Sequence, residues 1–282
     1  MWRRARRWIA ALGTVAALAG CGGHSPPPPI AVAATEDAQA QLIASLYVAA
    51  LRYYGNPAHV VAAADPLRQL DAGEATVVPG FTGQLLMRFD PTAAARSDTL
   101  VYRKLLSVLP EGIAAGDYTV SADDKPTLAV TEQTEQAWGA RDVTAFLRRC
   151  DETTVGAVEG GRTPERVGSC RVSVQRFPDT DAMFAALQSS QVQAAWTTSA
   201  APDVPSEAVI LTDEQSLIRA ENIVPLYRRN ELSESQVLAL NEIAGVLDTG
   251  SLADMRRQVA EGTEPGLVAD EWLQSHPLGV GR

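Results

Sequence analysis

Short apolar segments alternate with amphipathic ones from residue 30 onward, and this alternation limits the possible folds more than any other feature of the chain. Three apolar segments have the length of buried strands, at residues 30–35, 59–65 and 75–79. Between the first two, apolar side chains recur with helical spacing, which predicts a helix that begins after Thr35 and ends at Gly55. A shorter helix is expected from Pro66. Strand–helix alternation with short connections predicts parallel strands and right-handed crossovers.

The same rhythm returns between residues 127 and 213, and the sequence is helical from Ser233 onward. Ser233 and Gln236 have the spacing of a capping box, in which each side chain bonds the backbone of the other residue. Ser251 is expected to begin the next helix and Pro265 the last one. We therefore predict an α/β protein with two lobes and a helical C-terminal tail.

The N-terminus has the pattern of an export signal. Four arginines precede an apolar run from Trp8 to Gly20, which is shorter than the ~20 residues of a membrane span. The tetrad Leu-Ala-Gly-Cys that ends at Cys21 resembles the bacterial lipobox, whose cysteine becomes the lipidated first residue. We predict a signal peptide over residues 1–20 and a lipid anchor at Cys21. A secretory signal cut elsewhere, with Cys21 an ordinary thiol, is the alternative.

Residues 21–29 hold two glycines and four consecutive prolines, so they are expected to form a semi-rigid tether. His24 lies in this tether and is interpreted as solvated spacer. The folded part then begins near Ile30 at the extracytoplasmic face of the cell membrane, where the anchor would hold it.

The charge of the chain argues against nucleic acid as a partner. Without the four signal arginines the chain has 20 basic and 34 acidic residues, a net charge of −14. No basic cluster remains in the sequence to bind nucleic acid or anionic lipid.

Two cysteines remain besides Cys21, and in an oxidising compartment an even pair favours a disulfide. A bond between Cys150 and Cys170 would close a loop of about 20 residues, a constraint of about 3 kcal/mol by loop entropy. A redox or metal pair is the alternative, but the spacing is not CxxC and no histidine is near in sequence.

The sequence contains no motif of a known catalytic site. A GxSxG elbow, a phosphate-binding loop, a Rossmann glycine fingerprint and an HExxH pair are all missing. The three histidines, at positions 24, 59 and 276, have no metal-ligand spacing. We therefore expect neither an enzyme nor a bound cofactor or metal.

Three stretches resemble substrate-binding lipoproteins of ABC importers for glycine betaine, choline and carnitine. They are VAATEDAQAQLIASLYVAAL from Val32, LDAGEATVVPGFTGQLL from Leu70 and ILTDEQSLIRAENIVPLYRRNEL from Ile210. The second stretch fits the family's pattern at seven positions: Gly73, Glu74, Pro79, Thr82, Gly83, Leu85 and Leu86. It departs at three, where Thr76, Gly80 and Phe81 stand for the family's Asp, Glu and Tyr. The resemblance extends from about Ile30 to Gly279.

This resemblance implies a type II periplasmic-binding-protein fold, with the ligand between two lobes at the carboxyl ends of strands. Lobe 1 would comprise residues 30–118 plus 226–282, and lobe 2 residues 119–225. Hinge strands are expected near Tyr118–Thr127 and Asn222–Leu226. Gly80 and Gly83 would let the backbone bend sharply at a strand end. Phe81 would then face the cleft, with packing in the core of lobe 1 as the alternative.

The candidate ligand-binding residues follow from the resemblance: Thr35, Glu36, Phe81, Thr82, Asp124 and Trp196. Ring faces and carboxylates are the groups that recognise a quaternary ammonium. The sequence has fewer rings than the family expects, since Pro126 and Ala220-Glu221 stand near family aromatic positions. Glu36 and Asp124 have the alternative of solvated turn or N-cap residues.

The predicted function is that of an extracytoplasmic solute-binding lipoprotein of an ABC transporter. It would act as a monomer that captures a small polar or quaternary-ammonium solute and delivers it to permease and ATPase subunits. A binding-protein fold kept as an envelope scaffold or sensor without transport is the alternative.

Overall fold

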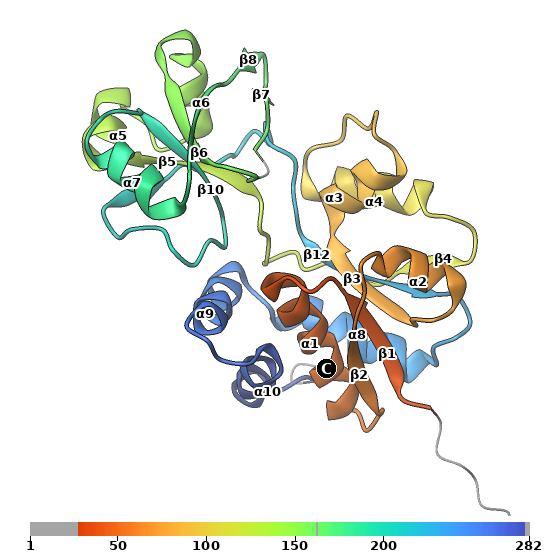
Figure 1. Ribbon diagram of the computed structural model, residues 1–282. Coiled ribbons are helices and arrows are strands. Elements are labelled where there is room, and N and C mark those ends of the chain that lie inside the picture. Colours follow the sequence, from red (N-terminus) through yellow and green to blue (C-terminus); the bar gives the residue numbers. More distant parts are fainter. Residues whose placement is uncertain (1–27, 162, 280–282) are drawn as a thin grey trace, which may run out of the picture.

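A computed structural model describes residues 28–161 and 163–279 of the chain. The predicted signal peptide, Cys21, His24 and all but the last two residues of the tether lie outside the described residues. Two five-stranded sheets form the cores of two lobes (Figure 1).

The first sheet has the strand order β2-β1-β3-β12-β4. Its strands, in chain order, are β1 (Ile30–Ala34), β2 (Ala58–Ala62), β3 (Val77–Phe81), β4 (Ile113–Ala115) and β12 (Ile223–Arg228). Strand β1 pairs in parallel with β2 and β3, so the predicted parallel strands are confirmed. Strand β12 returns late in the chain and runs antiparallel to β3 and β4.

Helices cover both faces of this sheet because both faces of β1 are apolar. Val32 belongs to a core formed with α1 and the C-terminal helices, whereas its neighbour Ala33 belongs to the core on the opposite face. The helices of this part of the chain are α1 (Ala38–Tyr53), α2 (Pro66–Ala72), α3 (Thr82–Phe89) and α4 (Asp98–Val108). Helix α1 is capped by Asp37, which accepts a hydrogen bond from the Ala40 amide, rather than by Thr35.

The second sheet has the order β11-β5-β10-β6-β9. Its strands are β5 (Pro126–Thr131), β6 (Thr154–Val158), β9 (Ser173–Phe177), β10 (Ala194–Thr198) and β11 (Ala208–Ile210). Four short elements accompany it: α5 (Glu132–Trp138), α6 (Val143–Leu147), the 3₁₀ helix η1 (Cys150–Glu152) and α7 (Thr180–Gln188). Strands β5 and β11 are antiparallel to their neighbours, so this sheet is mixed.

A two-stranded hairpin, β7 (Arg166–Val167) and β8 (Cys170–Arg171), projects from the second lobe. The disulfide between Cys150 and Cys170 ties β8 to η1, so the predicted pairing is confirmed. The hairpin therefore has a covalent attachment in addition to its two backbone pairings.

Three helices form the C-terminal tail, α8 (Glu234–Val246), α9 (Thr249–Ala260) and α10 (Pro265–Ser275). They lie against α1 on one side of the first sheet (Figure 1). The capping box of Ser233 and Gln236 is confirmed. Helix α9 begins earlier than expected, because the Asp248 carboxylate accepts a hydrogen bond from the Ser251 amide and caps the helix.

The chain crosses between the sheets twice, after β4 and before β12, and hydrogen bonds join the two crossings. The buried amide of Asn222 donates to the carbonyls of Thr119 and Ala122. The backbone amide of Asp124 donates to the Glu221 carbonyl. These segments fall where the hinge strands are expected, and the residue limits of the lobes (30–118 with 226–282, and 119–225) stay a prediction.

Within the described part of the chain, no helix is both long and apolar enough to cross a membrane. The same residues contain no group of three or more His, Cys, Asp or Glu side chains that could hold a metal ion.

Candidate ligand-binding cleft

A cavity of about 710 Å³ lies where the carboxyl ends of β1 and β3 meet the first turns of α1, α2 and α3. Its far wall comes from the crossings and the second lobe, through Asp124, Pro126, Thr198 and Glu221. Strands β1 and β3 are parallel, so both end at the same edge of the sheet, and the helices that follow them begin there. The volume suits a small solute.

The corner between β3 and α3 forms one wall of this cavity. Phe81 lies on the wall and also packs against the main core, so its ring contacts both the cavity and the core. The backbone passes directly from strand to helix between Phe81 and Thr82, and neither Gly80 nor Gly83 has a positive φ. Gly83 instead permits close approach, because a Cβ atom would lie 2.5 Å from the Ala220 carbonyl oxygen.

Thr82 lies behind the wall rather than on it. The residue is fully buried, and its hydroxyl accepts a hydrogen bond of 3.2 Å from the backbone amide of Asn222. Thr82 thus connects the first lobe to a crossing and positions the corner. Its role as a direct ligand contact stays a prediction.

Asp124 lines the cavity where three segments far apart in the sequence meet. Its Oδ1 is 2.7 Å from Nη1 of Arg256 on α9, and its Oδ2 is 2.6 Å from Nε2 of Gln39 on α1. The side chains of Asp124 and Arg256 are 9% and 18% exposed. The carboxylate is therefore already compensated by a cation of the protein, and a cationic ligand would share it with Arg256.

The loop before α1 contributes Thr35 and Asp37 to the cavity, whereas Glu36 is exposed and is not a lining residue. The Thr35 hydroxyl donates to the Asp37 carboxylate, and the Thr35 carbonyl accepts a 2.6 Å hydrogen bond from the Gln41 side chain. This local network fixes the loop at the end of β1.

Trp196 lies in the core of the second lobe and is not among the lining residues. The residue is 4% exposed, and its Nε1 has no hydrogen-bond partner among the described residues. Thr198, two residues later on β10, lines the cavity instead. The Thr198 hydroxyl is also buried without a partner in the described chain, so it is available to a ligand.

Among the described lining residues, four are acidic (Asp37, Asp65, Asp124 and Glu221) and two are basic (Arg88 and Arg256), a formal net charge of −2. Sequence reasoning missed most of them. Asp65 is the N-cap of α2 and forms a 3.6 Å ion pair with Arg88, and the Glu221 carboxylate accepts from the Gln84 amide at 2.9 Å. For Glu221, the sequence offered one indication of a place in the site: the residue stands near a position where the family has an aromatic residue.

The chemistry of this cavity is recognition by one aromatic ring, an acidic surround and several hydrogen-bonding groups. Phe81 is the only aromatic side chain among the described lining residues. A ring face contributes about 0.5–2 kcal/mol to the binding of a desolvated cation. The described lining contains neither histidine nor cysteine.

A protein-family profile for the substrate-binding domain of ABC-type glycine betaine transport systems matches residues 28–275. The chain belongs to this family. The profile covers both lobes and the C-terminal helices, and the family consists of substrate-binding proteins for transport. No curated protein sequence is significantly similar to this chain.

Solved structures agree with this family assignment at the level of the fold. Apo YehZ from Escherichia coli superposes with a TM-score of 0.69 at 19% identity, covering 88% of this chain and 98% of that one. A glycine betaine/carnitine/choline ABC transporter protein gives a TM-score of 0.73 at 13% identity with the same coverage. An ABC-transporter choline-binding protein in complex with choline gives 0.54 at 13% identity, covering 88% of both chains. The predicted type II periplasmic-binding-protein fold is confirmed.

Proposed function

We propose that this family member is an extracytoplasmic lipoprotein that captures a small polar or quaternary-ammonium solute in the cleft and delivers it to an ABC permease. The observation that carries the proposal is the cavity at the ends of β1 and β3, with walls from both lobes and a net charge of −2. The acidic lining favours a cationic group, and the Phe81 ring offers it a face.

Solute capture needs no bond-making step. The lobes close over the solute, the closed form docks on the permease, and ATP hydrolysis by a partner subunit reopens the site. The two hydrogen-bonded crossings are the segments about which the lobes would turn. Lipid attachment at Cys21 would keep the protein at the outer face of the cell membrane.

A binding screen tests the solute-capture proposal. Thermal unfolding and calorimetry of the purified protein are measured with glycine betaine, choline, carnitine, proline and polyamines. A solute at 100 times its dissociation constant is expected to add about 2.7 kcal/mol to the free energy of unfolding. The Phe81→Leu variant should bind choline about 2–30-fold more weakly, because leucine keeps an apolar side chain but removes the ring face.

Tyr53→Leu is the matched control, since Tyr53 is an aromatic residue that is 51% exposed and does not line the cavity. Equal losses in both variants would contradict a site at Phe81. A screen without any stabilising solute would contradict solute capture and favour the envelope scaffold or sensor. The anchor is tested separately: Cys21→Ala should move the protein from the membrane fraction to the soluble fraction.

A further inference from the structure

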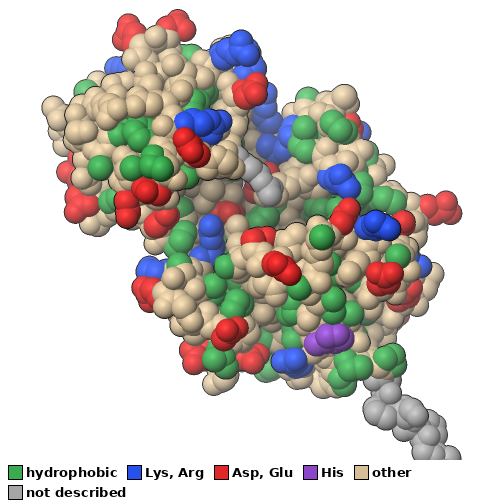
Figure 2. Space-filling model, viewed as in Figure 1, with side chains coloured by type: hydrophobic (Ala, Val, Ile, Leu, Met, Phe, Trp, Pro, Cys, Tyr) green, Lys and Arg blue, Asp and Glu red, His purple; other side chains and the backbone are tan. Residues whose placement is uncertain are grey.

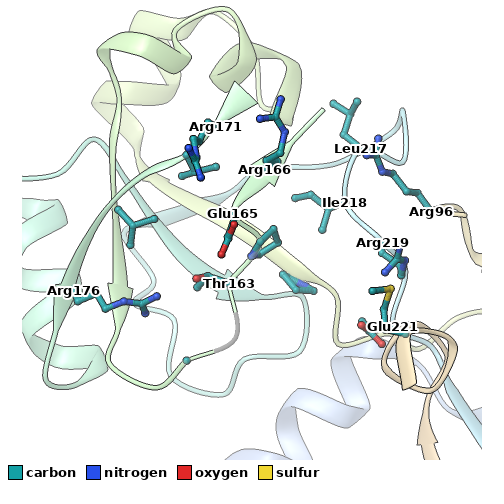
Figure 3. Close-up of a pocket in the computed structure, with 16 residues that line it drawn as sticks. Arg96, Thr163, Glu165, Arg166, Arg171, Arg176, Leu217, Ile218, Arg219 and Glu221 are labelled. Carbon is teal, nitrogen blue, oxygen red and sulfur yellow. The ribbon is translucent and has the colours of Figure 1, made fainter. Parts of the chain in front are cut away.

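A second cavity of about 810 Å³ adjoins the first one. The two share Pro126 and Glu221 as lining residues. One wall of the second cavity comes from β7, β8 and β9 of the second lobe, and the other from the loop before α4 and the segment before β12 (Figure 3). The second cavity therefore lies between the lobes and beside the first one, which is called the acidic cavity below.

Among the described residues, five arginines line this second cavity: Arg96, Arg166, Arg171, Arg176 and Arg219. The described lining also contains two carboxylates, Glu165 and Glu221, so its formal net charge is +3. Such a concentration is unusual in a chain whose predicted mature form has a net charge of −14. In Figure 2, Lys and Arg side chains gather on both sides of the gap between the lobes.

The arginines come from both walls. Arg166, Arg171 and Arg176 belong to β7, β8 and β9, one on each strand. Figure 3 shows Arg96 and Arg219 on the other side of the cavity, with Arg96 extending from its loop toward the gap. The two walls therefore present like charges to each other.

Backbone carbonyls, rather than carboxylates, hold three of these side chains. Arg219 donates to the carbonyls of Ala93 at 2.6 Å and Ala95 at 2.9 Å. Arg166 donates to Ser169, and Arg176 to Val158, in the same manner. Among the residues that the structure describes, none of the five arginines forms an ion pair within 4.0 Å.

Backbone carbonyls thus hold three of the arginine side chains in position, but no ion pair within the described chain neutralises the positive charge of the cavity. Burial lowers the pKa of Arg219, Glu221 opposes that shift and Arg96 adds to it. Closing the lobes would bring the arginines of the two walls nearer and raise their mutual repulsion. An anion between the walls would remove this repulsion and make charge-assisted hydrogen bonds to both.

We propose that the second cavity binds a small polyanionic solute with at least two carboxylate or phosphate groups. The planar guanidinium has a fork of donors that matches carboxylate and phosphate oxygens in pairs. A solute with two anionic groups reaches both walls at once, whereas a monoanion satisfies only one. The cavity volume lies within the range of small-molecule sites, about 300–1,000 Å³.

Calorimetry and thermal unfolding with citrate and with inorganic pyrophosphate test this proposal. Both probes are compared with acetate and with sodium chloride at equal ionic strength. At least one polyanion is expected to bind saturably and to raise the melting temperature, whereas acetate and chloride are not. Arg96→Gln and Arg171→Gln remove one cation from each wall, and each should weaken binding roughly tenfold or more.

Arg103→Gln is the matched control, because Arg103 is exposed on α4 and does not line the cavity. Binding no stronger than the salt control, or equal weakening by Arg103→Gln, would overturn the proposal. Arg96 and Arg171 come from separate elements, so a folding defect in one variant leaves the other as the test. Phe81 does not line the second cavity, so Phe81→Leu should leave citrate and pyrophosphate binding unchanged. The solute screen of the first cavity is a separate measurement. If no solute bound there, the proposed function would be refuted but this second site would not.

Discussion

The two cavities that share Glu221 as a lining residue differ in how their charges are compensated. In the acidic cavity, Asp124 pairs with Arg256 and Asp65 pairs with Arg88, so the protein supplies its own counter-ions. In the arginine-lined cavity, no ion pair to a lining arginine occurs within the described chain. The protein therefore supplies counter-ions for two carboxylates of the first cavity, whereas the arginines of the second cavity would gain theirs from an anionic ligand.

Removing the internal counter-ion is the strongest way to break this contrast. Asp124→Ala leaves Arg256 mostly buried and without its carboxylate, which should lower the free energy of unfolding by about 3–4 kcal/mol. Chemical denaturation measures the change. Asp254→Ala is the control, because Asp254 lies on the same helix as Arg256 and forms an exposed ion pair with Arg257. The side chains of Asp254 and Arg257 are 62% and 52% exposed, so this pair should contribute less than about 1 kcal/mol. Similar losses in both variants would show that the Asp124 pair is not a buried counter-ion.

The disulfide offers a change confined to the arginine-lined side. Replacing both Cys150 and Cys170 by Ala should lower the free energy of unfolding by about 3 kcal/mol, because the unfolded chain regains loop entropy. The same variant should weaken citrate or pyrophosphate binding, since the hairpin that carries Arg166 and Arg171 loses its covalent attachment. Choline binding serves as the internal control and should not change. An equal loss of affinity for both kinds of ligand would contradict the separation of the two cavities.

Gly83→Ala perturbs the boundary that the cavities share and should have the smallest effect of the three. The new methyl group would lie 2.5 Å from the Ala220 carbonyl oxygen and 2.7 Å from Oε1 of Glu221, so the segment before β12 must move. Such overpacking costs about 1–3 kcal/mol of folding stability and should alter both binding affinities.

Gly245→Ala is the matched control, because Gly245 lies within α8 and no described atom of a neighbouring residue would lie within 4 Å of the new methyl group. This control should gain about 0.5–1 kcal/mol from improved helix propensity. A stabilised Gly83→Ala variant would show that the crossing is not tightly packed against α3.

Features that depend on neighbours in the sequence were predictable. The apolar spacing of residues 42–54 and the Pro66 start identified α1 and α2, and the short apolar segments identified β1 to β3. Helix starts were less accurate, since Asp37 caps α1 two residues after Thr35 and Asp248 caps α9 three residues before Ser251. Asp, Ser and Thr are all favoured as helix caps, so the residue type alone does not decide between close neighbours.

Features that depend on distant contacts were not predictable. The partners of Asp124 lie 85 and 132 residues away in the sequence, and the five lining arginines are scattered from position 96 to 219. Trp196 has the kind of aromatic ring that forms a ligand cage, but its side chain packs in the core of the second lobe. Strand periodicity gives two faces to every strand, and only the fold decides which of them meets a cavity.

Arg256 has a consequence for how the lobes can move. Its Nη1 lies 2.7 Å from Asp124 on a crossing and also 2.7 Å from the carbonyl of Ala200, which follows β10 in the second lobe. Helix α9 therefore adds a third point of attachment beside the two crossings. Opening the cleft therefore requires either a movement that keeps this contact or the release of the Ala200 carbonyl by Arg256.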